Sequence, residues 1–375
     1  MVLSTVVGFF SALRVFIFLV SLAAASVAGL TPAMAKGMGG GSGMRDPLAV
    51  YFPGYDSNGD GHLDREEWKR RGNFDRLDAD KNGTIEPSEF KSLYEDWGRK
   101  GPMSAPILPA VPPVMDATLD QNRVTIEDLG KQAVCSIVRM GVPGAFKCNN
   151  GGELAEQAGL IETGIGPVFP QGSFCHGIDE IYAMDYTDKT GASRHGGIDL
   201  PTDFGTPMLA AATGTVVGKF DPERHARGKT VVLRHSPEDT GLPFWVYTEY
   251  GHLDELPEQA IGQRVRMGEV LGPTGNTGIA MKSRSTVSKR RPGVHFAVYY
   301  SDSPQFVEVP NYVVPKDGRW MDPNALYRLK PPYDSQSLLS LPDAEKEVPV
   351  PIMYLDGTVE PAASKLIWPY ACKRD

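Results

Sequence analysis

The sequence predicts a mainly β protein in which an antiparallel sheet domain follows a small α-helical unit. Between residues 170 and 330, β-branched and aromatic runs recur between Gly, Pro and Asp with little helical periodicity, which favours strands. Gly (41) and Pro (31) are frequent among the 375 residues, which favours short strands and turns over long helices. The clearest strand candidates are TPMLAAATGTVVGKF, KTVVLRH, FWVYTEYGHL and VHFAVYY.

The N-terminus carries the features of an export signal. Val15 to Leu30 form an apolar run, preceded by Arg14 and followed by the small-residue cleavage site Ala33-Met34-Ala35. The run is shorter than the ~20 residues that a membrane-spanning helix needs. We therefore expect an exported protein whose signal peptide (1–35) is removed. Contact with a membrane is expected only if the signal is retained as an anchor.

Composition divides the rest of the chain into segments. At 41% hydrophobic and 22% charged residues it is typical of a soluble globular protein, and a net charge of -8 gives no reason to expect nucleic acid as a partner. The expected segments are a flexible Gly/Ser stretch (36–46), a charged helical unit (47–100), a Pro-rich linker (101–115), an extension (116–169), the strand domain (170–330) and a C-terminal extension that wraps it (331–375).

Export permits disulfides, and the chain has four cysteines, Cys135, Cys148, Cys175 and Cys372. Four cysteines allow three pairings, which the sequence cannot resolve. Cys135 with Cys148 is the most local choice and leaves Cys175 to tether the C-terminal tail through Cys372. The spacing does not resemble the paired C-x-x-C of structural zinc sites, which favours disulfides.

Two acidic loops in the charged unit match the twelve-residue EF-hand pattern, in which calcium takes roughly six to eight oxygen ligands. Oxygens are expected from loop positions 1, 3, 5, 7, 9 and 12, and a Gly occupies the sharp turn at position 6. Two tandem matches predict two bound Ca²⁺ ions. The expected ligands are Asp56, Asn58, Asp60, His62, Asp64 and Glu67 in the first loop, and Asp78, Asp80, Asn82, Thr84, Glu86 and Glu89 in the second.

Only ten residues, Trp68 to Leu77, separate the loops, too few for two full helices. Leu63 can pair with its counterpart across the two loops. Exported hands of this kind bind weakly, with Kd of ~10⁻⁴ to 10⁻³ M. We therefore expect a structural or docking role first and switching second. A further stretch, 119–131, resembles residues 77–89 and is either a decayed third hand or an ordinary helix entry.

The strand region contains a set of residues suited to a catalytic zinc. They occur in His195-Gly-Gly-Ile-Asp199, Tyr250-Gly-His252-Leu253 and Val294-His295-Phe296. Such a zinc takes three protein ligands from His and carboxylate and leaves a position for water, whose pKa falls to about 7. His195, Asp199 and His295 could be the ligands of one Zn²⁺. His252 could be the further group that moves a proton or stabilises an oxyanion.

The order and surroundings of these residues resemble the lysostaphin/LytM family of zinc endopeptidases over roughly residues 190 to 301. HGGIDLPTDFGTPMLAAATGTVV resembles its first metal segment, YTEYGHL its Tyr-x-His-Leu segment, RMGEVLGPTGNTG its Gly-x-Thr-Gly loop and GVHFAVYY its last metal strand. The resemblance implies a β-sheet groove with zinc on its floor and metal-assisted cleavage of peptidoglycan stem or cross-link peptides. It also implies a bacterial periplasmic or cell-envelope location.

The resemblance assigns zinc to His195, Asp199 and His295, and one catalytic histidine to His252. The family's last motif is His-x-His, however, and its first His corresponds to Gly293. Losing a proton-transfer group can cost about 10² to 10⁴ in rate. His176 is the best candidate to take its place. Of the other histidines of this domain, His235 is expected to be structural and His225 solvated.

Three readings of function follow. The chain is an active zinc endopeptidase, a non-catalytic relative that binds cell wall or activates another cell-wall hydrolase, or a calcium-responsive scaffold. Retention of all three ligands favours the enzyme. A basic insertion, MKSRSTVSKRRP (281–292), lies where the family has a short connection, and it either binds stem-peptide carboxylates or is a solvated loop.

Overall fold

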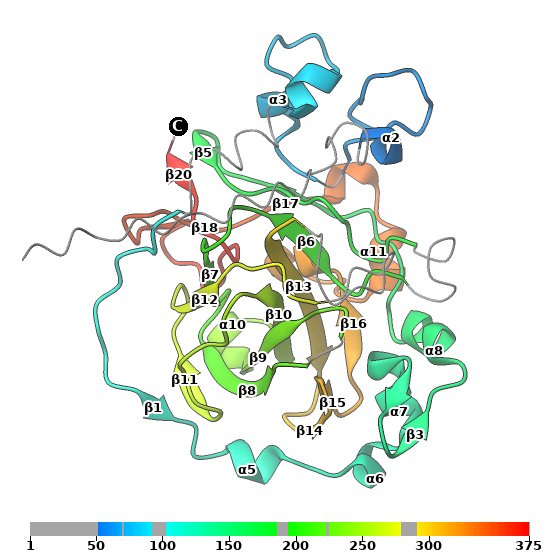
Figure 1. Cartoon of the computed structure of the whole chain (residues 1–375), viewed down its shortest axis with the longest axis vertical. Coiled ribbons are helices and arrows are strands. Elements are labelled where there is room, and N and C mark those ends of the chain that lie inside the picture. The colour runs from blue at the N-terminus through cyan, green and yellow to red at the C-terminus, as the bar shows by residue number, and fades with distance from the viewer. Residues whose placement is uncertain are drawn as a thin grey trace, which may run out of the picture. The chain divides into compact units, whose positions relative to one another are not determined.

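The central sheet of the described residues has eight strands, and all of its neighbouring pairs are antiparallel (Figure 1). The predicted strand runs occupy its middle, so the mainly β fold class is confirmed. In sheet order the strands are β1 (Val114–Met115), β11 (Gln263–Val265), β8 (Gly214–Phe220), β9 (Lys229–His235), β10 (Trp245–Leu253), β13 (Gly293–Ser301) and β16 (Arg319–Met321), with β6 (Ile198–Pro201) also beside β13.

This computed structural model describes residues 52–69, 71–91, 103–185, 194–222, 225–278 and 291–374, all within one unit, Arg45–Asp375. The signal peptide, the Gly/Ser stretch and most of the basic insertion lie outside the described residues, so the expectations for them remain predictions. None of the helices in the described ranges is long and apolar enough to cross a membrane.

The middle strands are buried on both faces. Every residue of β13 is buried, as is every residue of β10 after Trp245. Such strands show continuous apolar runs rather than alternation, which is why VHFAVYY was recognisable in the sequence. Smaller pairs flank the sheet: β7 (Pro207–Leu209) with β12 (Val270–Pro273), β14 (Phe306–Val309) with β15 (Tyr312–Pro315), and β2 (Gly141–Val142) with β3 (Phe146–Lys147).

The C-terminal extension is bound to residues 166–174, around the start of the strand domain. Two strand pairs join it to these residues, and a third lies within the extension itself. They are β4 (Gly166–Val168) parallel to β17 (Glu347–Pro349), β5 (Ser173–Phe174) with β20 (Lys373–Arg374), and β18 (Ile352–Met353) with β19 (Val359–Glu360).

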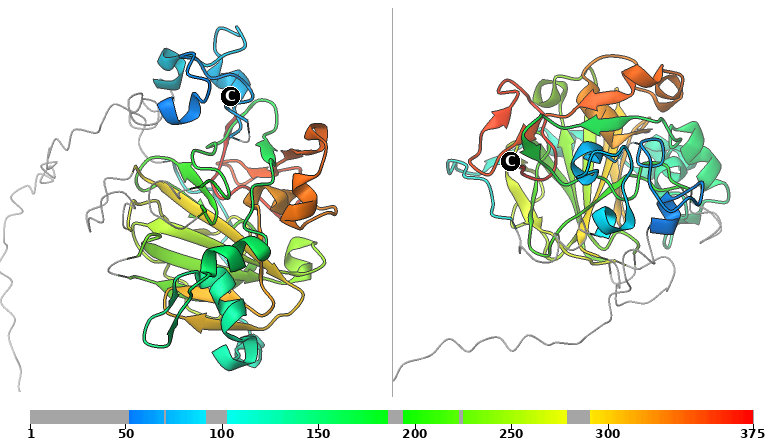
Figure 2. Two further views of the ribbon diagram at one scale, coloured as in Figure 1. Left: turned by 90° about the vertical axis from the view of Figure 1, so that its right-hand side faces the viewer. Right: turned by 90° about the horizontal axis from the view of Figure 1, so that it is seen from above.

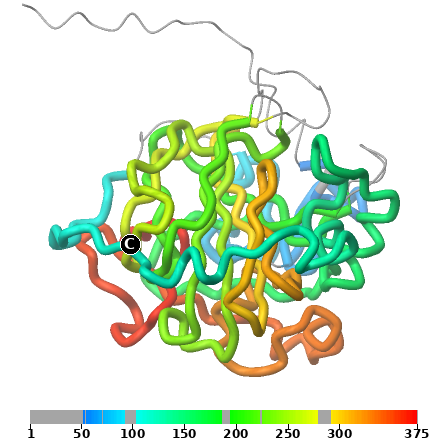
Figure 3. The backbone as a smooth tube through the Cα atoms, turned by 90° about the horizontal axis from the view of Figure 1, so that it is seen from below, coloured from blue at the N-terminus to red at the C-terminus, as the bar shows by residue number. Residues whose placement is uncertain are grey.

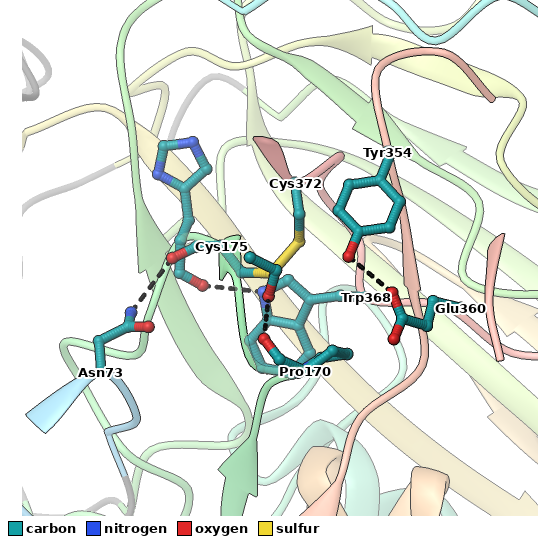
Figure 4. Close-up of a disulfide and its surroundings, with 9 residues drawn as sticks. Asn73, Pro170, Cys175, Tyr354, Glu360, Trp368 and Cys372 are labelled. Atoms are coloured by element: carbon teal, nitrogen blue, oxygen red, sulfur yellow. Dashed lines mark hydrogen bonds between the residues drawn. A yellow bond between two sulfur atoms is a disulfide. The ribbon is translucent and has the colours of Figure 1, made fainter. Parts of the chain in front are cut away.

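Both disulfides have the pairing that the sequence favoured, Cys135–Cys148 and Cys175–Cys372. Figure 4 shows the second of them beside the indole of Trp368, whose Nε1 donates to the carbonyl of His176 at 2.8 Å. The tail therefore wraps the domain as expected.

Residues 116–138 use their acidic groups within the fold. The Asp116 carboxylate accepts hydrogen bonds from Arg234 (2.9 Å) and Thr215 (2.8 Å), both on the sheet. Figure 3 shows this teal segment running across the strands. No cluster of metal-ligating side chains occurs there among the described residues. The helices are α5 (Leu119–Asn122), α6 (Ile126–Leu129) and α7 (Lys131–Val138).

The remaining helices are short and lie at the edges of the domain (Figure 2). They are α8 (Gly151–Gln157), α10 (Pro237–Thr240), η1 (Pro323–Arg328), α11 (Ser335–Leu339) and η2 (Asp343–Glu345).

The two acidic loops form a paired unit with its own apolar core. Leu63 and Ile85, one from each loop, exchange backbone hydrogen bonds of 3.0 and 2.8 Å, which confirms the expected pairing. The core includes Phe52, Trp68 and Phe90. Short helices precede the loops, α2 (Phe52–Tyr55) and α3 (Phe74–Leu77), and the chain bends between them at Gly72, whose φ is +75°.

Candidate metal centre and active site

Three side chains from two neighbouring strand segments bring their donor atoms together. His195 Nε2 lies 3.0 Å from His295 Nδ1, which lies 3.1 Å from Asp199 Oδ1, and the remaining edge of the triangle is 3.4 Å. Tetrahedral zinc with bonds of ~2.0–2.1 Å requires donors about 3.3 Å apart. The donor set and its spacing therefore fit one Zn²⁺ ion.

The sequence His-Gly-Gly-Ile-Asp suits this geometry because the strands approach closely. Asp199 on β6 pairs with His295 on β13. A Cβ on Gly197 would lie 2.5 Å from the Phe296 carbonyl oxygen and 3.0 Å from the His295 ring. A Cβ on Gly196 would lie 2.7 Å from the Trp320 ring. Both glycines are needed so that His195 and Asp199 can reach His295.

The hydrogen bonds of the ligands set their protonation. His195 Nδ1 donates to the carbonyl of Ile181 at 3.0 Å, which keeps the lone pair on Nε2, the nitrogen that faces the donor triangle. Burial disfavours the charged form of His195, but the nearby Asp199 carboxylate outweighs burial and raises its pKa. Burial lowers the pKa of His295 to about 3, so this imidazole is neutral at pH 7, as metal binding requires.

His252 lies beside the triangle on an irregular part of β10. The register with β9 shifts between Tyr250 and Leu253, and His252 has a φ of 65°, which is uncommon outside glycine. Its ring centre is 6.0 Å from that of His295. Its Nδ1 donates to the carbonyl of Thr277 at 2.7 Å, which places the basic lone pair on Nε2. The bulge thus places an imidazole of defined tautomer beside the donor triangle.

The other three histidines of the domain have structural contacts. His235 is fully buried, with its ring nitrogens bonded to Thr213 and Thr248, as expected. His225 is half-buried rather than freely solvated, contrary to expectation. It bonds the Tyr312 hydroxyl at 3.0 Å, and burial lowers its pKa to about 3. The prediction failed because DPERHARGK reads as an exposed turn, while β15 packs against it.

His176 is buried against Thr202, to which its Nε2 is hydrogen-bonded at 3.1 Å, and against the Tyr370 ring. It is absent from the cluster of donor atoms that includes His195, Asp199 and His295. Burial lowers its pKa to about 4. These contacts suit a packing role better than replacement of the missing histidine.

Gly293 has no room for a side chain. It is paired with Pro201, and a Cβ there would lie 2.7 Å from the Leu200 carbonyl oxygen and 2.9 Å from the Cα of Pro201. Both atoms belong to the backbone of β6, which carries Asp199. A side chain at position 293 therefore requires β6 to move.

We expect Gly293→Ala to lower the free energy of unfolding by about 1–3 kcal/mol through overpacking. Gly293→His should cost at least as much and should not increase any cutting of cell-wall peptide. Urea denaturation and a peptide-release assay measure the two effects. A histidine variant that is as stable as the wild type and cuts faster would contradict this prediction.

A buried charge pair next to the site was not foreseen from the sequence. Arg227 and Glu249, 5% and 1% exposed, form an ion pair of 2.5 Å, and the Tyr299 hydroxyl donates to Glu249 at 3.3 Å. The Arg227 carbonyl accepts from the His252 backbone N–H at 2.7 Å. The pair thus fixes the backbone that supports the bulge. No motif marks it, because the partners are 22 residues apart on different segments.

The two acidic loops bring together carboxylates that the EF-hand pattern names as ligands. Each loop brings together three of the expected groups, within 4.8 Å of one another. They are Asp56, Asp60 and Glu67 in the first loop, and Asp78, Asp80 and Glu89 in the second. Burial and the nearby Glu86 carboxylate raise the pKa of Glu89. Carboxylates held this close favour a bound cation, so both loops fit Ca²⁺.

Known protein families match both the strand domain and the acidic loops. Residues 193–307 match the model of peptidase family M23, and residues 55–70 and 74–94 match the EF hand. An uncharacterized metalloprotease of Haemophilus influenzae is 39% identical over 92 residues, which are 24% of this chain and 18% of that protein. The chain thus matches less than a fifth of that relative's length.

Among solved structures, the lysostaphin catalytic domain from Staphylococcus simulans is 23% identical, with 30% of this chain and 73% of that chain covered and a TM-score of 0.23. A mutant catalytic domain of the prophage-encoded M23 protein EnpA from Enterococcus faecalis is 22% identical, with 30% and 72% covered and a TM-score of 0.23.

The family models cover the segments that hold the donor triangle and the paired acidic loops. Residues 193–307 therefore match peptidase family M23, and the two acidic loops that precede them match the EF hand.

Proposed function

We propose that this protein is an exported zinc metalloendopeptidase that cleaves the peptide cross-links of peptidoglycan. The donor triangle of His195, Asp199 and His295 carries the proposal, because its edges of 3.0–3.4 Å suit tetrahedral zinc. Stem or cross-link peptides are the proposed substrates. A bacterial periplasmic or cell-envelope location agrees with the two disulfides.

The protein's own groups divide the work. His195 Nε2, Asp199 Oδ1 and His295 Nδ1 would hold the metal, which would supply an acidified water and a Lewis acid for the scissile carbonyl. His252 takes up or delivers a proton at Nε2. The Thr277 carbonyl holds the ring of His252 in that tautomer, and the Ile181 carbonyl does the same for His195.

The EF-hand pair has, in this proposal, two Ca²⁺ ions and a structural or docking role. The expected ligands in each loop are the oxygens at positions 1, 3, 5, 7, 9 and 12. A long groove that opens on calcium binding is not part of the proposal. The bend at Gly72 and the short helix α3 leave no pair of full helices between the loops.

The alternative is a non-catalytic relative that binds cell wall or activates another cell-wall hydrolase. The tight contact of Gly293 with β6 favours it, because the family's second histidine cannot be accommodated there as the strands lie. Zinc content cannot separate the two functions, since both retain the ligands. Turnover can.

Incubation of the purified protein with bacterial sacculi is expected to release cross-linked peptides at a rate that falls to background after chelation and returns with stoichiometric zinc. Mass spectrometry of the released fragments identifies the scissile bond. Zinc binding with no release from any sacculus type would reject the enzyme and leave the binding or activator function. Absence of zinc binding would also reject the enzyme.

A further inference from the structure

One short segment connects the EF-hand pair to the candidate zinc centre. Residues 175–184, here called the bridging segment, lie between β5 and the first metal segment. Five hydrogen bonds of 2.8–3.0 Å join it to residues 195–199. The pairs are Asp179 N to Asp199 O, Asp199 N to Glu180 O, Ala183 N to His195 O, His195 N to Met184 O, and His195 Nδ1 to Ile181 O.

The other side of the bridging segment contacts the chain between the two acidic loops. Its Ile178 N–H donates to the Arg71 carbonyl at 3.0 Å, and its Cys175 carbonyl accepts from Asn73 Nδ2 at 3.1 Å (Figure 4). At Gly177 the backbones are so close that a Cβ would lie 2.8 Å from the Arg71 carbonyl oxygen. The contact thus combines backbone atoms with one short side chain, that of Asn73.

Asp179 is the point where these contacts converge. It is 4% exposed, its backbone N–H is bonded to Asp199, and its carboxylate accepts a hydrogen bond from the hydroxyl of Tyr55. The same carboxylate forms an ion pair with Arg291, four residues before His295. Asp179 therefore contacts one metal-bearing strand through its backbone and is paired to the residues that lead into the other.

Residues that flank both ends of the first acidic loop contact the bridging segment. Tyr55 immediately precedes Asp56, the ligand at loop position 1. Arg71 donates from Nη1 to the carbonyl of Glu67, the ligand at position 12, at 2.7 Å, and stacks on the Tyr55 ring at 4.4 Å.

Calcium is expected to draw the two ends of the first acidic loop together. Without a cation, the carboxylates of Asp56, Asp60 and Glu67, all within 4.8 Å, repel one another and favour an open loop. A bound Ca²⁺ ion draws positions 1 and 12 to a common centre. Tyr55 adjoins position 1 and Arg71 is bonded to position 12, so a closed loop would hold both side chains in place. Tyr55 would in turn hold the Asp179 carboxylate.

We propose that Asp179 is a positioning residue through which calcium in the first EF-hand strengthens zinc binding at His195, Asp199 and His295. The inference rests on the proposed zinc site, but not on turnover. Because coupling between two binding sites is reciprocal, zinc must strengthen calcium binding by the same factor. Coupling between sites is typically about 5- to 150-fold, and such a factor is readily measured.

The test is the zinc Kd of the purified full-length protein, obtained by competition with a chromophoric chelator in calcium-free and calcium-saturated buffer. We expect at least about a 5-fold lower zinc Kd with calcium. Tyr55→Phe removes only the hydroxyl that bonds Asp179, and Asp179→Asn removes the charge. In both variants the ratio of the zinc Kd without calcium to the zinc Kd with calcium should fall close to one.

Tyr354→Phe is the matched control. Its hydroxyl also donates to a carboxylate, Glu360, at 2.7 Å, but in the C-terminal extension (Figure 4). Tyr354→Phe should keep the full decrease in zinc Kd that calcium causes in the wild type. A calcium-independent zinc Kd in the wild type, or the same factor in Tyr55→Phe, would overturn the inference and leave the zinc site intact. Absence of zinc binding under both conditions would overturn the proposed function as well.

Discussion

Replacing His252 with asparagine is expected to lower kcat for cell-wall peptide release by about 10²–10⁴-fold while the protein keeps its zinc. Asparagine tolerates the left-handed backbone at this position, where φ is 65°, and its amide can still donate to the Thr277 carbonyl. It cannot carry a proton at neutral pH. The variant therefore tests proton transfer with little disturbance of the bulge.

Rates are to be compared at saturating substrate, with zinc content measured on the same samples. His62→Ala is the control for loss of an imidazole, because this exposed side chain lies in the first calcium loop, where position 7 offers only its backbone carbonyl. It should leave kcat unchanged. If the His252 variant loses zinc together with activity, the histidine is a ligand rather than a proton carrier.

The donor set could be predicted because each part of it lies in a short local pattern. His195 and Asp199 occur in one segment with the two glycines that let it approach His295, and the last strand is a continuous apolar run. Once β6 and β13 pair in this register, the three donors meet. The EF-hand loops are still more local, since twelve consecutive residues contain all the ligands of each site.

What could not be predicted depends on contacts between distant segments. The Arg227–Glu249 pair, the parallel β4–β17 pairing and the contact of His225 with Tyr312 each join residues that no periodicity relates. Asp179 is the clearest case. In the sequence it is one acidic residue in an irregular stretch, whereas in the fold it contacts Tyr55, next to the first acidic loop, and Asp199 of the donor triangle.

Removing the Cys175–Cys372 disulfide, by alanine at both positions, is expected to lower the free energy of unfolding by about 5 kcal/mol, as chain-entropy arguments give for a loop this long. The bond spans 197 residues and holds the C-terminal extension against the bridging segment. Both cysteines are fully buried, so alanine avoids the unsatisfied hydroxyl that serine would introduce.

The Cys135–Cys148 bond is the matched comparison, since it spans only 13 residues and should contribute about 3 kcal/mol. Urea denaturation of the two double-alanine variants should therefore separate their stabilities by about 2 kcal/mol. Equal losses would show that loop length does not decide the contribution. Because Cys175 begins the bridging segment, its variant should also bind zinc more weakly, whereas loss of Cys135–Cys148 should leave the zinc Kd unchanged.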